Sequence, residues 1–126
     1  MTIKRVQSVS VPVSDQDKAL DFYTNKLGLE KRNDEPMGDG LRWLEVAPAG
    51  ADTVIILAKG YGSWSEERVG TFAGIVFWTD DMRSTYEELS SRGVKFTETP
   101  SMQPWGMMQA LFEDQDGNGF VLVGQK

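Results

Sequence analysis

The stretch Gln-Pro-Trp-Gly-Met-Met-Gln-Ala-Leu-Phe-Glu-Asp-Gln-Asp-Gly-Asn-Gly-Phe, residues 103–120, predicts a β-hairpin. The turn is expected at residues 114–119, because Asp-Gly-Asn-Gly at 116–119 supplies the positive φ angles of tight hairpin turns. The apolar run Phe-Val-Leu-Val at 120–123 then returns as a strand. Trp105 lies at the mouth of this hairpin, between Pro104 and Gly106.

The chain before residue 60 predicts a strand, a helix and further strands. Residues 6–13 alternate, so Val9, Val11 and Val13 share one strand face. Ser14, with Asp17 three residues later, predicts the start of a helix, with apolar residues at helical spacing. The polar stretch up to residue 40, rich in Pro and Gly, is interpreted as a loop. Strands are expected at 41–46 and 53–58, and a polar loop at 59–70.

The same series then begins again. Residues 73–79 predict a strand, and Asp80-Asp81 predict the cap of a second helix that ends at Gly93. A short extended segment at 94–96 and a loop lead to the hairpin. Residues 13–15 match residues 79–81, and Gly40 matches Gly106, both 66 positions apart.

This duplication predicts an α+β fold of two tandem βαβββ modules, at about residues 4–60 and 70–124. One such sheet cannot bury both its faces, so we expect the pair to form a curved sheet around a concave cavity. The 126 residues suffice for a single domain, 1–126.

Composition excludes several classes of function. There is no histidine, so no imidazole can act as a general acid, a triad member or a metal ligand. There is no cysteine to serve as a nucleophile or form a disulfide. The net charge of −6 argues against nucleic acid as a partner and weakly favours cationic ligands. No apolar run is long enough to span a membrane and no signal peptide is evident, so we expect a cytoplasmic protein.

The hairpin resembles the last hairpin of the vicinal oxygen chelate superfamily, which includes glyoxalase I, extradiol dioxygenases, fosfomycin-resistance enzymes and bleomycin-resistance proteins. The resemblance is carried by Trp-Gly at 105–106 and by Phe-Glu-Asp-Gln-Asp-Gly-Asn at 112–118, with Gln115 where the superfamily usually has proline. Residues 21–30 resemble its first helix and the exit from it. The entry Gln-Pro-Trp-Gly at 103–106 is most similar to the bleomycin-resistance branch.

The resemblance also implies where metal ligands would stand. The four positions are occupied here by Ser8, Ile56, Gly74 and Val121. A divalent cation needs imidazole, carboxylate or comparable donors, and three of these residues have no side-chain donor. We therefore expect no metal and no other cofactor, with Ile56 and Val121 as apolar lining of a pocket.

Four tryptophans suggest flat walls for a planar or cationic ligand. Parity places Trp43 beside Glu45, whose carboxylate suits a cation, and it places Trp78 on the face that also carries the position equivalent to Ser8. The alternative is that individual tryptophans fill the core or a dimer interface. The predicted ligand-binding residues are Trp43, Glu45, Trp78, Trp105, Gln109, Ser8, Ile56 and Val121.

The favoured hypothesis is non-covalent sequestration of a drug or metabolite by a homodimer, as the resemblance to bleomycin-resistance proteins implies. Two alternatives remain open. One is a superfamily enzyme, glyoxalase-, lyase- or dioxygenase-like, acting on a small organic substrate. The other is a ligand-sensing regulatory subunit. The sequence does not identify catalytic residues, and the donor-poor metal positions favour binding over catalysis.

Overall fold

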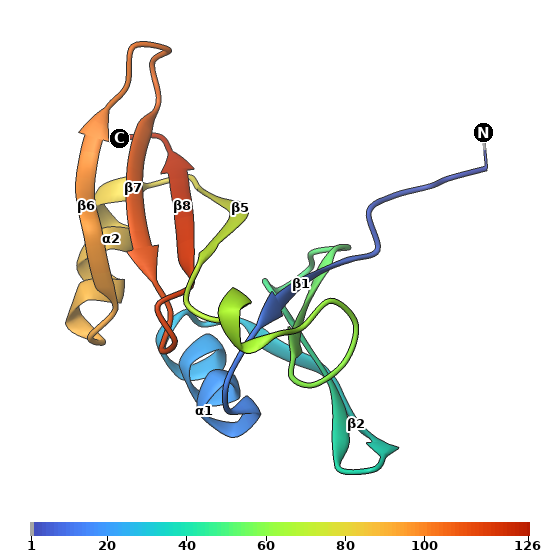
Figure 1. The fold of residues 1–126 in the computed structure, drawn as a ribbon. Helices are drawn as coiled ribbons and strands as arrows, with labels where there is room; N and C mark the ends of the chain where they lie inside the picture. Colours follow the sequence, from blue (N-terminus) through green and yellow to red (C-terminus); the bar gives the residue numbers. More distant parts are fainter. Residues whose placement is uncertain (1) are drawn as a thin grey trace. The chain divides into compact units, whose positions relative to one another are not determined.

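The computed structural model describes residues 2–126, which form two compact units that divide between Gly70 and Thr71 (Figure 1). Each unit contains one four-stranded mixed sheet and one main helix. Each also follows the order strand, helix, strand, strand, strand. The predicted α+β fold of two tandem βαβββ modules is therefore confirmed. No helix within residues 2–126 is long and apolar enough to cross a membrane.

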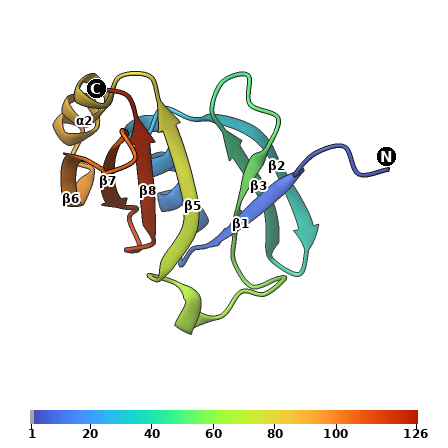
Figure 2. The same cartoon turned by 90° about the horizontal axis from the view of Figure 1, so that it is seen from above.

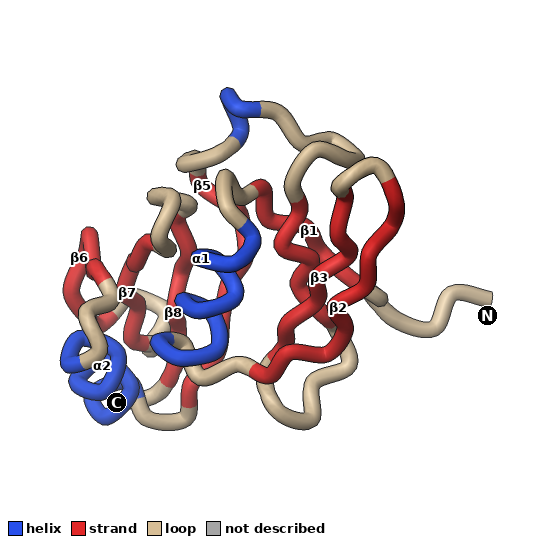
Figure 3. The backbone as a smooth tube through the Cα atoms, turned by 90° about the horizontal axis from the view of Figure 1, so that it is seen from below, coloured by secondary structure: helices blue, strands red, loops and turns tan. Residues whose placement is uncertain are grey.

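The first unit has the sheet order β1-β4-β3-β2 (Figure 2). Its strands are β1 (Ser8–Pro12), β2 (Glu30–Gly38), β3 (Leu41–Ala47) and β4 (Val54–Ala58). β1 pairs with β4 in parallel, and the other two pairings are antiparallel. The long loop after β4 contains only a short 3-10 turn, Glu66–Arg68 (Figure 3).

The helix of this unit, α1 (Gln16–Asp21), continues into a π-helical turn at Phe22–Lys26. Its N-cap is Asp15, whose carboxylate accepts a hydrogen bond of 3.0 Å from the backbone N–H of Lys18. The predicted start at Ser14 was therefore one residue early. Asp15 holds the extended conformation that an N-cap needs, and a side-chain oxygen there satisfies one of the free N–H groups of the first turn.

The largest error of the sequence analysis lies at residues 30–38. This stretch was predicted to be a loop, but it is the nine-residue strand β2. Its register with β3 shifts twice, once between Lys31 and Asn33 and once between Pro36 and Gly38. β2 is an edge strand, exposed along almost its whole length, so its polar residues need not alternate with apolar ones. Gly38, Asp39 and Gly40 have positive φ angles and form the turn into β3.

The second unit has the sheet order β5-β8-β7-β6. Its strands are β5 (Phe72–Thr79), β6 (Lys95–Met102), β7 (Met108–Glu113) and β8 (Gly119–Gly124). β6 is longer than the predicted segment 94–96 and includes Pro100, which an edge strand tolerates. The helix α2 (Met82–Ser91) begins after Asp81, whose carboxylate accepts from the N–H of Ser84 at 3.0 Å.

The predicted hairpin is formed by β7 and β8. At its turn, the buried carboxylate of Asp114 accepts hydrogen bonds from the backbone N–H groups of Asp116 and Asn118 and from the Asn118 side chain, all at 2.9 Å. Gly117 has a φ of 83°. The Asp114 carboxylate therefore shapes the turn.

Most core side chains of each unit lie on one face of its sheet, although β4 is buried on both faces. In the first unit the fully buried side chains include Val11, Leu44, Val46 and Leu57. In the second, Phe77, Phe112 and Phe120 stack at centroid distances of 5.5–6.0 Å, and Tyr86 of α2 packs edge-on against Phe96. These aromatic contacts attach α2 to one face of the sheet, as Figure 1 shows near β6. The opposite face, which we call the open face, carries all of the predicted site residues except Trp105.

Candidate functional site

The open face of the first sheet brings together four of the predicted residues. Register partners in adjacent strands lie side by side and project to the same face. One such row runs from Ser10 through Ile56 and Glu45 to Asn33. Ser8 and Trp43, two residues from members of this row, project to the same face. The parity prediction for Trp43 and Glu45 thus agrees with the strand register, and Ser8 and Ile56 lie on the same face.

Trp43 is held in place by two contacts. Its indole Nε1–H donates to the Glu45 carboxylate at 2.9 Å. Its ring stacks on Tyr61, with centroids 5.8 Å apart and planes inclined by 23°. Trp43 and Glu45 are both half-buried. The result is an aromatic pair with a carboxylate at the indole edge, and no basic residue forms an ion pair with Glu45 within residues 2–126.

Tyr61 was not among the predicted site residues. It belongs to the loop after β4, which was predicted only as a polar loop at residues 59–70. Its hydroxyl is buried and has no hydrogen-bond partner within the described residues. Burial raises the pKa of Tyr61, and the backbone of Leu44 and the side chain of Gln16 oppose that rise without reaching hydrogen-bonding geometry. The only sequence signal was an aromatic residue between two glycines.

The open face of the second sheet brings together three more predicted residues. One row runs from Trp78 through Val123 and Gln109 to Ser101. A neighbouring row runs from Val76 through Val121 and Leu111 to Glu98, as the register of the same strands shows. Trp78, Gln109 and Val121 therefore share one face.

Trp78 is half exposed, at 50%. Its Nε1–H donates to the carboxylate of Asp80 at 3.0 Å. Asp80-Asp81 were predicted to cap α2, but only Asp81 does so, and the Asp80 carboxylate instead accepts a hydrogen bond from the indole.

Trp105 lies apart from these rows. It occupies the turn between β6 and β7, which is closed by backbone hydrogen bonds from Gln103 to Met107 and from Gly106 to Gln103. Its side chain is 64% exposed, which makes it one of the most exposed large apolar side chains of the protein. An exposed indole at a loop tip is available for contact with a ligand or a second chain.

The four positions that would hold a superfamily metal do not fit one. Ser8 is half-buried on β1, and Ile56 is 4% exposed on β4. Gly74 has a φ of 73° within a register shift of β5, and Val121 lies mid-strand in β8. Within residues 2–126 no three His, Cys, Asp or Glu side chains gather in a metal-binding arrangement. We therefore derive no chemical step through a metal at these positions.

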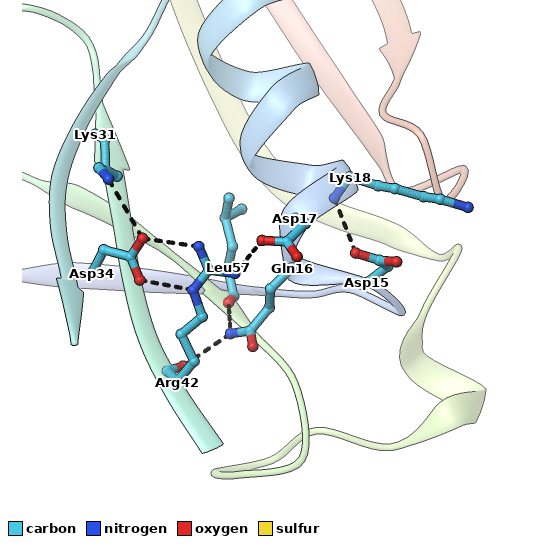
Figure 4. Close-up of polar contacts among 8 residues, drawn as sticks. All are labelled: Asp15, Gln16, Asp17, Lys18, Lys31, Asp34, Arg42 and Leu57. Atoms are coloured by element: carbon cyan, nitrogen blue, oxygen red, sulfur yellow. Dashed lines mark hydrogen bonds and ion pairs between the residues drawn. The ribbon is translucent and has the colours of Figure 1, made fainter. Parts of the chain in front are cut away.

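A polar cluster that was not predicted surrounds Arg42 of β3, the residue before Trp43 (Figure 4). The Arg42 guanidinium donates to both carboxylate oxygens of Asp34, at 2.7 and 2.8 Å, and to Asp17 at 2.7 Å. The Gln16 side chain donates to the backbone carbonyls of Arg42 and Leu57, at 2.9 and 2.8 Å. These contacts connect β2, β3 and β4 to the start of α1.

The cluster borders a cavity of about 440 Å³ lined by Asp15, Gln16, Asp17, Gly40, Leu41, Arg42, Lys59 and Gly60. The Asp34 carboxylate holds the pKa of Arg42 above its ordinary value, and Arg42 lowers that of Asp34. Because the guanidinium already binds two carboxylates, it has little capacity left for an anionic ligand. We interpret the cluster as a structural clamp.

Comparison with known proteins agrees with this architecture. Residues 5–122 match the family model described as the Glyoxalase/Bleomycin resistance protein/Dioxygenase superfamily. The chain belongs to this superfamily. An uncharacterized protein of Bacillus subtilis, YetH, is 42% identical over 121 residues, covering 95% of this chain and 98% of that protein.

Two further relatives bear on function. The crystal structure of TnmS3 from Streptomyces sp. CB03234, described as an antibiotic binding protein, is 40% identical, with a TM-score of 0.86 and coverage of 100% of this chain and 99% of that one. A "Probable lactoylglutathione lyase" of Synechocystis is 27% identical over 117 residues, covering 90% of this chain and 89% of that protein. The superfamily member thus resembles both a binding protein and a protein named as an enzyme.

Proposed function

We propose that this superfamily member binds a small organic molecule without turning it over, and that it sequesters an antibiotic or a metabolite. The observation that carries the proposal is the similarity to TnmS3 along the full length of both chains, at 40% identity. The open faces support the proposal, because each presents a tryptophan whose indole N–H is hydrogen-bonded to a carboxylate, and neither presents a set of metal ligands within the described residues. Flat indole surfaces favour a planar ligand, and the adjoining acids favour a cationic one.

The test is native mass spectrometry of the protein purified from its source, followed by titration of the emptied protein with the released compound. A retained organic molecule that quenches tryptophan fluorescence on rebinding, and is recovered chemically unchanged, supports sequestration. Recovery of a chemically altered compound after incubation would refute it. The same spectra report bound metal and the number of chains, so they also test the expected homodimer.

The second candidate is a lyase-like activity, favoured by the similarity to the Synechocystis protein. The residues at Ser8, Ile56, Gly74 and Val121 weigh against it, because metal-assisted chemistry needs donor side chains there. Formation of lactoylglutathione from methylglyoxal and glutathione, measured with and without added nickel or zinc, decides between the two. Metal-dependent turnover would favour the enzyme.

A further inference from the structure

Both units contain the same local arrangement, in which an indole N–H donates to a carboxylate two residues later. In the first unit the pair is Trp43 and Glu45, at 2.9 Å, and in the second it is Trp78 and Asp80, at 3.0 Å. The two pairs do not occupy equivalent positions of the repeated modules. The modules are 66 positions apart, and this spacing aligns Trp78 with Pro12 and Trp43 with Gln109.

This arrangement restricts what the tryptophan offers to a ligand. The indole has a single hydrogen-bond donor, and the carboxylate already occupies it. A ligand therefore meets the negative face of the ring and the acceptor oxygens of the carboxylate, but no donor from the pair. Both features attract a positive charge, and neither favours an anion.

The net negative charge of the second unit also favours a positively charged ligand. Residues 71–126 contain eight acidic and four basic side chains. Three of the basic residues already form ion pairs, namely Arg83 with Glu87, Arg92 with Glu88, and Lys95 with Glu113. Asp80 forms no ion pair within residues 2–126, although its carboxylate is exposed beside an indole that is itself half exposed.

The neighbours of Trp78 extend this surface across the sheet. Val123 of β8 lies directly beside Trp78, and Gln109 of β7 follows in the same row. Trp78 and Gln109 are thus two strands apart, about 10 Å at ordinary strand spacing. The row presents an indole, an apolar floor and an amide that can accept a hydrogen bond.

We propose that Trp78 and Asp80, with Val123 and Gln109, form a binding site for a planar aromatic cation on the open face of the second sheet. This proposal rests on the proposed small-molecule binding function and specifies its ligand class. The ring of the cation stacks on Trp78, its positive charge lies near Asp80, and its far edge reaches Gln109 over Val123.

The probe is N-methylacridinium, compared with uncharged acridine of nearly the same shape at mildly alkaline pH. Binding is followed by dye and tryptophan fluorescence. The Glu45→Gln protein serves as background, so that the carboxylate of the first-unit pair adds no attraction for the cation. In this background N-methylacridinium should bind about fivefold more tightly than acridine. Only the charged probe gains a charge–π contact with Trp78 and a partly screened ion pair with Asp80.

Asp80→Asn is the decisive substitution, because the amide oxygen can still accept from the indole while the charge is lost. It should weaken N-methylacridinium about threefold, because the ion pair is lost while the charge–π contact with Trp78 remains, and it should change acridine binding less than twofold. Glu87→Gln is the matched control, an exposed acid on α2, which packs on the other face of the sheet. Asp80→Glu should restore the preference for the cation, and melting curves show whether each variant is folded.

Equal affinity for both probes, or equal losses in Asp80→Asn and Glu87→Gln, would overturn the inference. Small-molecule binding itself would survive that result, because native mass spectrometry tests it independently of ligand charge. Failure of both probes to bind would also reject the aromatic-cation site. The sequestration proposal would then depend only on the compound retained from the source.

Discussion

Replacing Asp34 with asparagine should destabilise the first unit through the Arg42 clamp. The wild-type carboxylate receives two parallel hydrogen bonds from the guanidinium, at 2.7 and 2.8 Å, and the two side chains are only 23% and 25% exposed. Hydrogen bonds to charged groups contribute about 1.5–3 kcal/mol when shielded, and fully exposed ion pairs contribute about 0–1 kcal/mol. A pair that is a quarter exposed falls between these limits, so we expect a loss of about 1–2 kcal/mol.

The assay is urea unfolding followed by circular dichroism, with thermal melting as a second measure. For a chain of this length, 1–2 kcal/mol corresponds to a fall in Tm of roughly 4–8 °C. Glu35→Gln, on the same strand, is the matched control, because Glu35 is exposed and forms no ion pair within the described part of the chain. It removes the same charge and should change the unfolding free energy by less than about 0.5 kcal/mol.

The difference between wild type and Asp34→Asn should also depend on pH. The hydrogen bond from Arg42 is the main cause that lowers the pKa of Asp34 below its ordinary value of 3.8, and burial opposes it. Because folding lowers the pKa of the Asp34 carboxyl, its ionised form stabilises the folded state above pH 3.8. This stabilisation is lost as the pH falls through the lowered pKa of Asp34 in the folded protein. If the two proteins are equally stable at pH 7, or if their difference is unchanged well below pH 3.8, the clamp assignment is wrong.

Three further outcomes are expected. Micromolar zinc, nickel, manganese or iron should leave Tm unchanged, because a metal that bound the folded state would raise it; a rise reversed by chelator would contradict the reading of Ser8, Ile56, Gly74 and Val121. Light scattering should give about 28 kDa, twice the 14.1 kDa chain, and a monomer at tens of micromolar would count against the homodimer. Trp105→Ala should weaken ligand binding about tenfold with little loss of Tm, since the side chain is 64% exposed; a large fall in Tm with unchanged affinity would make Trp105 structural.

Period-two alternation was sufficient to predict the sheet faces wherever one face is buried. On β1 and β3 the apolar core residues alternate with the site residues, so parity alone placed Trp43 and Glu45 on one side and Leu44 and Val46 on the other. On β4 every residue is apolar and buried, so alternation gives no information there. On β2 both faces meet solvent, no alternation is needed, and the strand was mistaken for a loop. Hydrophobic patterning reports burial, so it cannot detect an edge strand that buries nothing.

Contacts between distant residues were beyond the sequence analysis for a different reason. The Arg42 clamp joins residues 8 and 25 positions apart, and its partners look like ordinary surface charges in the sequence. The stack of Tyr61 on Trp43 requires the loop after β4 to fold back over the sheet, which composition does not specify. The contact between Asp80 and Trp78 was also missed, but it could have been predicted from the local sequence. A carboxylate two residues after a strand tryptophan projects to the same face, as was predicted for Glu45 and Trp43.

The two indole–carboxylate pairs differ in a way that bears on their roles. One face of Trp43 is covered by Tyr61, and the indole edge is fixed by Glu45, so a ligand meets a rigid surface that offers a single ring face. Trp78 has no aromatic partner within residues 2–126, and it is half exposed with only Asp80 to fix its edge. A preorganised ring loses little side-chain entropy on binding, whereas a freer ring can adjust to its ligand at a greater entropic cost. Under the proposed binding function we therefore expect Trp43 to select ligand shape, and Trp78 to hold ligands that share a positive charge but differ in outline.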